Sequence, residues 1–200
     1  QNIEEAVKIA AKRETFVSES IMVGSWQDNK TAIIEKTPTR MSIKMAAQDY
    51  IICSNHFQSE LFADDPLNIE NLETSDSPYR YNRMQELIGS SQLINPVRIA
   101  AILRDRAGVG GENIGLGNQK SINQLIAHHS IIFNPGQQLV WVSTKPWQLG
   151  PYIAYDLSVI FNELPGLKKD SSIIVDSLTI PADSFLYSKE YKNFLRYKEL

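Results

Sequence analysis

The chain has 200 residues, of which 42% are hydrophobic and 22% are charged, and its formal net charge is −3. This length and composition fit one globular domain or one half of a larger one, and they exclude a disordered or collagen-like chain. The small negative charge argues against a nucleic-acid binder, and no apolar run approaches the 18 residues of a membrane span. A single cysteine, Cys53, excludes an internal disulfide and a cysteine-rich zinc site, and it leaves the cellular compartment open.

The first part of the chain predicts a helix followed by four short strands. Apolar residues recur at helical spacing over residues 2–14. The pattern then changes to short β-prone runs about ten residues apart, separated by turn residues, which favours an antiparallel meander. The predicted strands are Ser20–Gly24, Thr31–Glu35, Met41–Met45 and Asp49–Cys53. A long polar loop is expected over residues 58–76.

Two helices are predicted next, because Ser77-Pro78 and Asn95-Pro96 each place a capping residue before a proline at the first helical position. The first helix should end near Ile88 and the second near Arg106. Further along the chain, the remaining predicted elements are a short helix at 121–127, a hairpin of strands 130–133 and 138–142 around Asn134-Pro135-Gly136, a strand at 152–157, and a helix from Pro181 to the end.

Strands and helices are thus segregated along the chain, which indicates an α+β fold with antiparallel sheets. The sequence shows no repeat and no low-complexity segment, so residues 1–200 are expected to form a single domain. Neither a metal nor a cofactor is expected. The glycines of Gly108–Gly117 follow a predicted helix, whereas a phosphate loop follows a strand, and His128 and His129 are adjacent, which points them in opposite directions on a strand.

Cys53 allows two interpretations. It lies in the apolar run Tyr50–Cys53, where a small buried side chain is expected. Alternatively, His56 could activate it as a nucleophile, although nothing in the surrounding sequence predicts a lowered pKa. We expect the structural role.

Asn55 is the first candidate site residue. It follows a predicted strand and precedes a long polar loop, so its amide could be directed into a cleft and donate a hydrogen bond to a developing oxyanion. The alternative is that an asparagine stands there because a turn favours it.

Arg80 and Arg83 form the second candidate feature. They are three residues apart near the predicted start of a helix, so they share a face where the helix dipole disfavours positive charge. This arrangement suggests acidic partners, which could be structural carboxylates or a bound anion.

Several of these segments together resemble the penicillin acyltransferase-like family, also called the C45 autoproteolytic acyltransferase/hydrolase family. That family is related to choloylglycine hydrolases and penicillin V acylases. The resemblance covers about residues 17–157. It is carried by Ile33-Ile-Glu35-Lys-Thr-Pro38, Ser54-Asn55-His56-Phe57, Ser77-x-x-Arg80-x-x-Arg83-x-x-Glu86-Leu87, His129–Phe133, Gln138–Val142 and Pro151–Tyr155.

The resemblance implies a four-layer αββα sandwich and N-terminal-nucleophile chemistry. In such enzymes self-cleavage exposes an N-terminal cysteine whose thiol attacks an amide or a thioester, with its own α-amine as the base. Asn55 matches the asparagine that stabilises the oxyanion. Either Arg80 or Arg83 matches an arginine near the nucleophile. We expect Arg80, which is nearer the helix start, to face Asn55, and Arg83 to pair with a carboxylate such as Glu86 or one from the 58–76 loop.

The chain departs from the family pattern at its first residue, because Gln1 cannot serve as the nucleophile. The resemblance therefore implies the C-terminal portion of an amidohydrolase or acyltransferase, inactive alone, whose nucleophile lies upstream or in another chain. Its partner would be a small-molecule acyl amide or thioester. The alternative is a non-catalytic module that keeps the fold for ligand binding or for a structural purpose.

Overall fold

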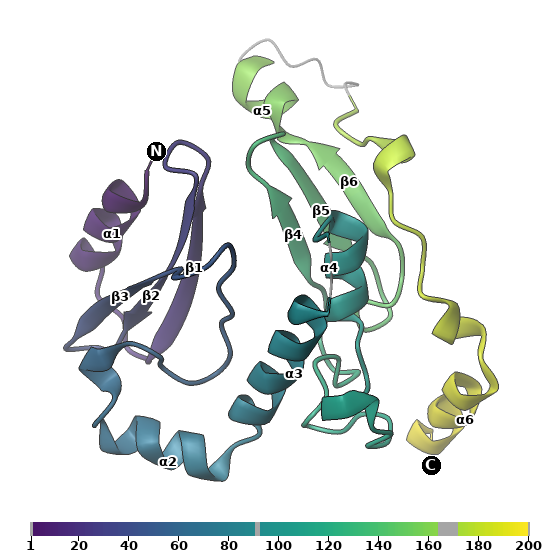
Figure 1. Cartoon of the computed structure of the whole chain (residues 1–200). Helices are drawn as coiled ribbons and strands as arrows, with labels where there is room; N and C mark the ends of the chain where they lie inside the picture. The colour runs from purple at the N-terminus through teal and green to yellow at the C-terminus, as the bar shows by residue number, and fades with distance from the viewer. Residues whose placement is uncertain (1, 91–92, 164–171, 200) are drawn as a thin grey trace. The chain divides into compact units, whose positions relative to one another are not determined.

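The computed structural model describes residues 2–90, 93–163 and 172–199. Two compact units divide the chain, residues 1–85 and residues 86–200, and each contains one three-stranded antiparallel sheet (Figure 1). The α+β prediction is therefore confirmed. The expectation of a single domain over residues 1–200 stays a prediction.

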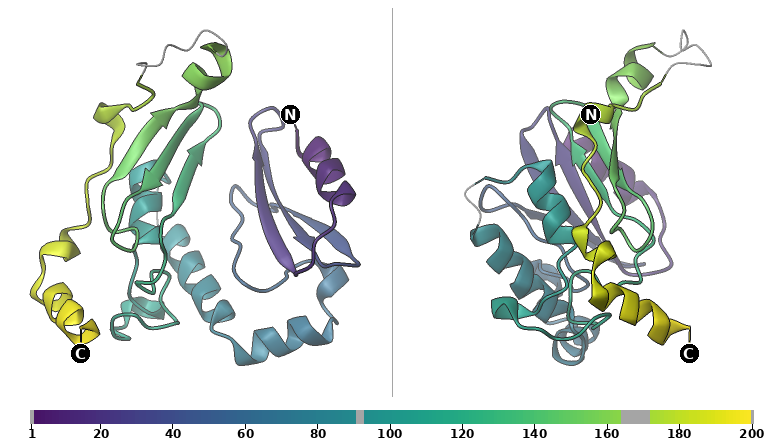
Figure 2. Two further views of the ribbon diagram at one scale, coloured as in Figure 1. Left: turned by 180° about the vertical axis from the view of Figure 1, so that it is seen from behind. Right: turned by 90° about the vertical axis from the view of Figure 1, so that its right-hand side faces the viewer.

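The first unit begins with helix α1 (Ile3–Lys12), which starts at Asn2 with a capping box. Strands β1 (Glu19–Ser25), β2 (Lys30–Lys36) and β3 (Met41–Met45) follow and pair in the order β1-β2-β3. All three agree with the predicted strands. Helix α1 covers one face of the sheet (Figure 2).

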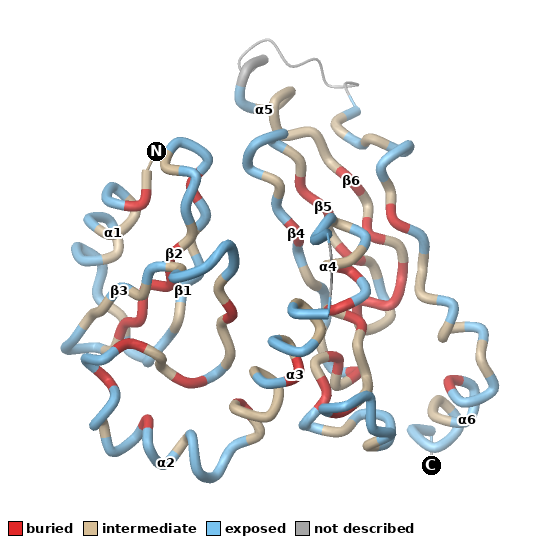
Figure 3. Tube along the Cα trace, in the orientation of Figure 1, coloured by how far each residue is buried: buried red, intermediate tan, exposed pale blue. Residues whose placement is uncertain are grey.

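Strand β2 carries the core of this unit (Figure 3). On one face, Ile34 lies under α1, and the ammonium group of Lys36 donates to the main-chain carbonyls of Ala10 and Arg13 at the end of that helix. On the opposite face, Ile33 and Glu35 are fully buried. A buried carboxylate needs donors, and Glu35 has two from the main chain of a later segment.

The prediction of a fourth strand at Asp49–Cys53 is wrong. This segment has no regular structure, and β3 pairs only with β2 in the described part of the sheet. A side-chain hydrogen bond reaches it instead, since Gln58 Nε2 donates to the Ile52 carbonyl. Gln58 is itself held from β3, because Lys44 Nζ donates to the Gln58 carbonyl. The apolar pattern reflects the burial of Ile52 rather than a strand ladder.

The prediction of a loop over residues 58–76 is also largely wrong, because this segment contains the 3-10 helix η1 (Glu60–Phe62) and the helix α2 (Pro66–Thr74). Asp65 caps α2 by accepting from the N–H groups of Leu67 and Asn68, and Pro66 is the first helical residue. Asp65-Pro66 is therefore the same start signal that predicted the next two helices. Helix α3 (Ser77–Gly89) follows, and its last residues belong to the second unit.

In the second unit, helix α4 (Pro96–Leu103) packs against the sheet of β4 (Ile131–Asn134), β5 (Leu139–Ser143) and β6 (Tyr152–Asp156). The Asn95 cap and the hairpin around Asn134-Pro135-Gly136 are confirmed. No helix forms at 121–127. The other helices described here are η2 (Val109–Gly111), α5 (Leu157–Glu163), η3 (Asp176–Leu178), η4 (Ser184–Tyr187) and α6 (Lys189–Lys198).

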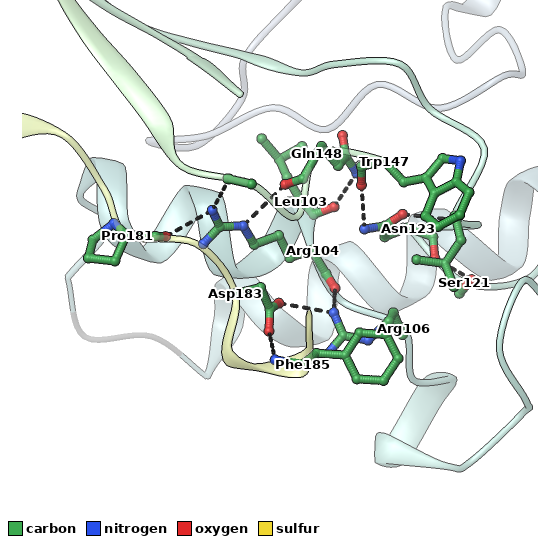
Figure 4. Close-up of polar contacts among 12 residues, drawn as sticks. Leu103, Arg104, Arg106, Ser121, Asn123, Trp147, Gln148, Pro181, Asp183 and Phe185 are labelled. Carbon is green, nitrogen blue, oxygen red and sulfur yellow. Dashed lines mark hydrogen bonds and ion pairs between the residues drawn. The ribbon is translucent and has the colours of Figure 1, made fainter. Parts of the chain in front are cut away.

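A buried arginine, Arg104 at the end of α4, connects that helix to the segments around residues 148–150 and 181 (Figure 4). The guanidinium group of Arg104 donates to the carbonyls of Gln148, Gly150 and Pro181 at 3.2, 2.7 and 3.0 Å. It also stacks over the ring of Tyr152, 4.8 Å from the ring centre. All of these contacts satisfy main-chain groups or pack an aromatic ring, so they hold the unit together.

Candidate functional site

A cavity of about 610 Å³ in the first unit contains Asn55 in its wall. It lies among the start of β1, the β2–β3 turn, the segment after Ile52 and helix α2. Most of its lining residues carry hydroxyl, amide or charged groups, and the apolar ones are Pro38, Phe57 and Leu67. Asn55 itself is exposed, so a ligand in the cavity can reach it.

Both main-chain groups of Asn55 are held by side chains from later helices. Its N–H donates to Ser77 Oγ at 2.7 Å, and its carbonyl accepts from Asn71 Nδ2 at 2.6 Å. Asn71 lies on α2 and Ser77 is the first residue of α3. The residue lies in a bend rather than at the end of a strand, so these two contacts, and not a sheet, set its position.

The Asn55 side chain is oriented by Arg80, whose guanidinium group donates to Asn55 Oδ1 at 2.7 Å. A guanidinium group has donors and no acceptor, so the amide atom facing it must be the oxygen. The amide nitrogen must then point elsewhere, and no hydrogen bond involves Nδ2 in the described part of the chain. Asn55 therefore presents two N–H donors that its own unit does not use.

The geometric expectation for Arg80 is confirmed by this contact, while its catalytic role stays a prediction. Burial lowers the pKa of Arg80, and the nearby Asp76 carboxylate opposes that shift by favouring the charged form. Asp76 is thus an acidic partner of the kind expected for a cation in the first turn of a helix. Arg83, one turn further along α3, is buried, and its predicted pairing with Glu86 stays a prediction.

Ser77 was predicted to cap α3, and the structure gives its hydroxyl a different role. The side chain is completely buried, and its Oγ lies 2.8 Å from His56 Nδ1 and 2.9 Å from Ser54 Oγ in addition to accepting from Asn55. The hydroxyl of Ser54 in turn donates to the Ser77 carbonyl. The main-chain N–H that donates to the Ser77 hydroxyl thus belongs to Asn55, 22 residues away, and not to a residue of its own helix.

Glu35 supports the same segment from the sheet. Its two carboxylate oxygens accept from the N–H groups of Gln58 and Ser59 at 2.5 and 2.9 Å. Those residues follow Asn55 closely in the chain, so Glu35 ties the segment to β2 on one side while Ser77 ties it to α3 on the other. The Glu35-x-x-Pro38 part of the sequence resemblance therefore has a structural purpose in this unit.

Cys53 is half-buried beside this segment, and burial raises the pKa of its thiol. A raised pKa disfavours the thiolate that a nucleophile needs. The ring of His56 is hydrogen-bonded to Ser77 through Nδ1, and its pKa is lowered chiefly by burial. These contacts favour a structural role for Cys53.

The sequence patterns did not predict the roles of two groups near the cavity, Asn71 and the pair Arg40 and Asp65. Asn71 gave no signal, because its bond to Asn55 depends on how α2 folds back. Arg40 and Asp65 form an ion pair in the cavity wall, and Arg40 lies over the ring of Phe62 at 4.9 Å. The Asp65 pKa is lowered, first by the N–H of Asn68 and also by Arg40. The cap signal of Asp65-Pro66 could have located this residue.

No three metal-ligating side chains come together among residues 2–90, 93–163 and 172–199. Within the same residues, no helix has the length and apolar character to cross a membrane. The glycine loop Gly108–Gly117 lies in the second unit, where Gly110, Gly111, Gly115 and Gly117 have positive φ, and only the short η2 forms there.

Comparison with known proteins gives one result. The model of the family described as acyl-coenzyme A:6-aminopenicillanic acid acyl-transferase matches residues 1–134, which include Asn55, Ser77 and Arg80. No significant match was found among curated proteins or among solved structures. The matched region covers more than half of the chain, and the resemblance drawn from the sequence motifs is confirmed. This chain therefore belongs to the acyl-coenzyme A:6-aminopenicillanic acid acyl-transferase family.

Proposed function

We propose that this chain supplies the oxyanion-binding part of a cysteine N-terminal-nucleophile acyltransferase or amidohydrolase, with Asn55 as the donor and Arg80 as the residue that orients it. The nucleophilic cysteine, exposed by self-cleavage, lies outside the 200 residues. The substrate is a small molecule with an acyl group in an amide or a thioester. Membership of the family supports acyl-transfer chemistry in general, and the amide orientation of Asn55 carries the more specific proposal.

The reaction proceeds in two steps. The thiolate adds to the acyl carbonyl carbon, and the carbonyl oxygen becomes an oxyanion that accepts a hydrogen bond from Asn55 Nδ2. The carbonyl then reforms, the amine or thiol leaves, and the proton taken from the thiol by the α-amine passes to the leaving group. The resulting thioester transfers its acyl group to water or to another acceptor, which regenerates the cysteine.

The observation that supports Asn55 most strongly is its unused donor. Three neighbours hold the residue, Ser77 and Asn71 at the main chain and Arg80 at Oδ1, while Asn55 lies in the wall of a cavity and its amide N–H groups have no protein acceptor among the described residues. A turn asparagine needs no such restraint on its side chain. A preorganised donor in the wall of a cavity is what stabilisation of a developing negative charge requires.

The test is Asn55→Ala in the complete protein that includes the nucleophile, assayed for release of amine or thiol from acyl amides and thioesters. Loss of one oxyanion donor should lower kcat by roughly 100- to 1000-fold. Asn82→Ala, an exposed asparagine on α3, is the matched control and should leave kcat unchanged. If Asn55→Ala turns over like the wild type, or if the complete protein has no acyl-transfer activity, the proposal is wrong and a non-catalytic module is the better description.

A further inference from the structure

Ser77 and His56 have the spacing of a nucleophile and its base, with Ser77 Oγ 2.8 Å from His56 Nδ1. Burial excludes that role, because the Ser77 side chain has no exposed surface and no substrate carbon can approach its hydroxyl. A polar group that is buried so completely is retained for the hydrogen bonds it makes within the fold. Those bonds converge on Asn55.

The Ser77 hydroxyl donates one hydrogen bond and accepts two. A hydroxyl has one proton to donate and two lone pairs to accept with. Its proton goes to Ser54 Oγ, because the proton of Ser54 is already donated to the Ser77 carbonyl. One lone pair accepts the Asn55 N–H and the other faces His56 Nδ1, which must therefore carry a proton. Every hydrogen-bonding position of the hydroxyl is thus occupied, and its orientation is determined.

The carbonyl side of Asn55 is held independently. Asn71 Nδ2 donates to it at 2.6 Å from helix α2, whereas Ser77 reaches the N–H from helix α3. Side chains from two helices therefore hydrogen-bond the N–H and the carbonyl of Asn55, which is itself exposed. No sheet pairing contributes, since Asn55 lies in a bend.

We infer that Ser77 and Asn71 are positioning residues for the reaction, which hold the Asn55 main chain so that its amide nitrogen meets the developing oxyanion. This inference rests on the proposed function. Neither residue touches the reacting atoms, so each acts only through Asn55. Small displacements of a catalytic group can cost on the order of 100-fold in rate, so loss of either anchor should be visible in kcat.

The experiment measures kcat and KM for Ser77→Ala and Asn71→Ala in the complete protein, each alone and combined with Asn55→Ala. We expect each single variant to lower kcat by about 10- to 100-fold with little change in KM, because the lost interaction acts in the transition state. In the Asn55→Ala background, the same substitutions should change kcat by less than about threefold, because the group they position is gone.

Ser121→Ala is the matched control, since Ser121 is a buried serine of the second unit whose hydroxyl also bonds main-chain carbonyls. It should lower stability and leave kcat unchanged. Should Ser77→Ala fail to fold, Asn71→Ala decides the question, because its side chain lies nearer the surface.

Two results would overturn the inference. One is that folded Ser77→Ala and Asn71→Ala proteins keep the wild-type kcat while Asn55→Ala loses it. The other is that their losses multiply fully with that of Asn55→Ala, which would mean that they act by another route. An Asn55→Ala protein with normal kcat would instead overturn the proposed function itself, so the two failures are distinguishable.

Discussion

Arg80 in the first unit and Arg104 in the second are both partly removed from water, and burial lowers the pKa of each. The guanidinium group of Arg104 donates to the main-chain carbonyls of Gln148, Gly150 and Pro181. A carbonyl oxygen is only an acceptor, so these bonds orient no other donor. Arg80 instead donates to the side-chain oxygen of Asn55, whose amide also carries N–H groups. An arginine that donates to main-chain carbonyls stabilises the fold. An arginine that donates to the oxygen of a side-chain amide also fixes the direction of the N–H groups of that amide.

The main-chain anchors differ in the same way. In the second unit, a single buried cation collects main-chain carbonyls from separate segments. In the first, a buried anion, Glu35, collects main-chain N–H groups, and the adjacent Asn55 remains exposed. Structural bonds thus surround a residue that is itself left open to the cavity. Substitutions in both units test this contrast.

Arg104→Met should destabilise the protein most. The substitution leaves three buried carbonyls without their charged donor and removes the stacking over Tyr152. We expect the free energy of unfolding to fall by about 3 kcal/mol or more. Chemical denaturation measures this. Arg106→Met, which removes the ion pair with Asp183, the bond to the Arg104 carbonyl and the stacking over Phe185, should cost less, about 1–2 kcal/mol. Equal losses for the two variants would refute a special role for Arg104.

Glu35→Gln should be the next largest. The amide keeps the shape of the side chain but replaces one acceptor oxygen with a donor that faces a main-chain N–H. The expected loss is about 1.5–3 kcal/mol in the free energy of unfolding, the usual value for a hydrogen bond to a charged group. Glu60→Gln, at an exposed position, is the control and should unfold like the wild type. A Glu35→Gln protein of wild-type stability would contradict the proposed anchoring.

Arg80→Ala should lower kcat by about tenfold, equivalent to about 1.4 kcal/mol, because the Asn55 amide can then rotate away from its productive orientation. Arg80→Lys keeps a donor and a charge, so its loss should be smaller. The pH–rate profile separates two roles. If Arg80 also favours the thiolate of the nucleophile, its removal should move the acid limb of the profile to higher pH. Unchanged kcat in the alanine variant would leave Arg80 without a part in the reaction.

The smallest effect concerns His56. Burial lowers the pKa of His56 in the folded protein, so the unfolded chain binds a proton there more readily. Stability should therefore fall as the pH drops below about 6.5, the ordinary histidine value, and should be fully retained above it. Unfolding curves at several pH values measure the slope. His56→Gln should flatten it, and an unchanged slope in that variant would assign the pH dependence to other groups.

The local signals in the sequence located most of the elements of both units. Short β-prone runs between turn residues marked β1 to β3, and a capping residue before proline marked α4. The resemblance to a family, together with the place of Arg80 near the helix start, also predicted that Asn55 and Arg80 would meet, although they are 25 residues apart. These predictions depended on patterns that a few neighbouring residues carry, or on the resemblance to a family.

The failures share a physical cause. The run before Asn55 had the apolar character of a strand, but no strand pairs with it in the described part of the sheet, and the Ile52 carbonyl accepts from the Gln58 side chain instead. Side chains from β2, β3 and α3 likewise bond the main chain of the residues that follow, Asn55 and Gln58. The Ser77 hydroxyl was assigned to its own helix, whereas it bonds Asn55 and His56. In each case a side chain distant in the sequence competed with the local alternative and displaced it.

The sequence alone thus determined the α+β class, the strands of both sheets, the helices α3 and α4 and membership of an acyltransferase family, because each depends on short-range patterns or on recognisable motifs. Only the tertiary structure decided which atoms of Asn55 remain available. That outcome depends on bonds from Asn71, Ser77 and Arg80, which lie 16 to 25 residues away. Such contacts form only when the intervening helices fold back, and a linear pattern does not record the direction in which an amide then points.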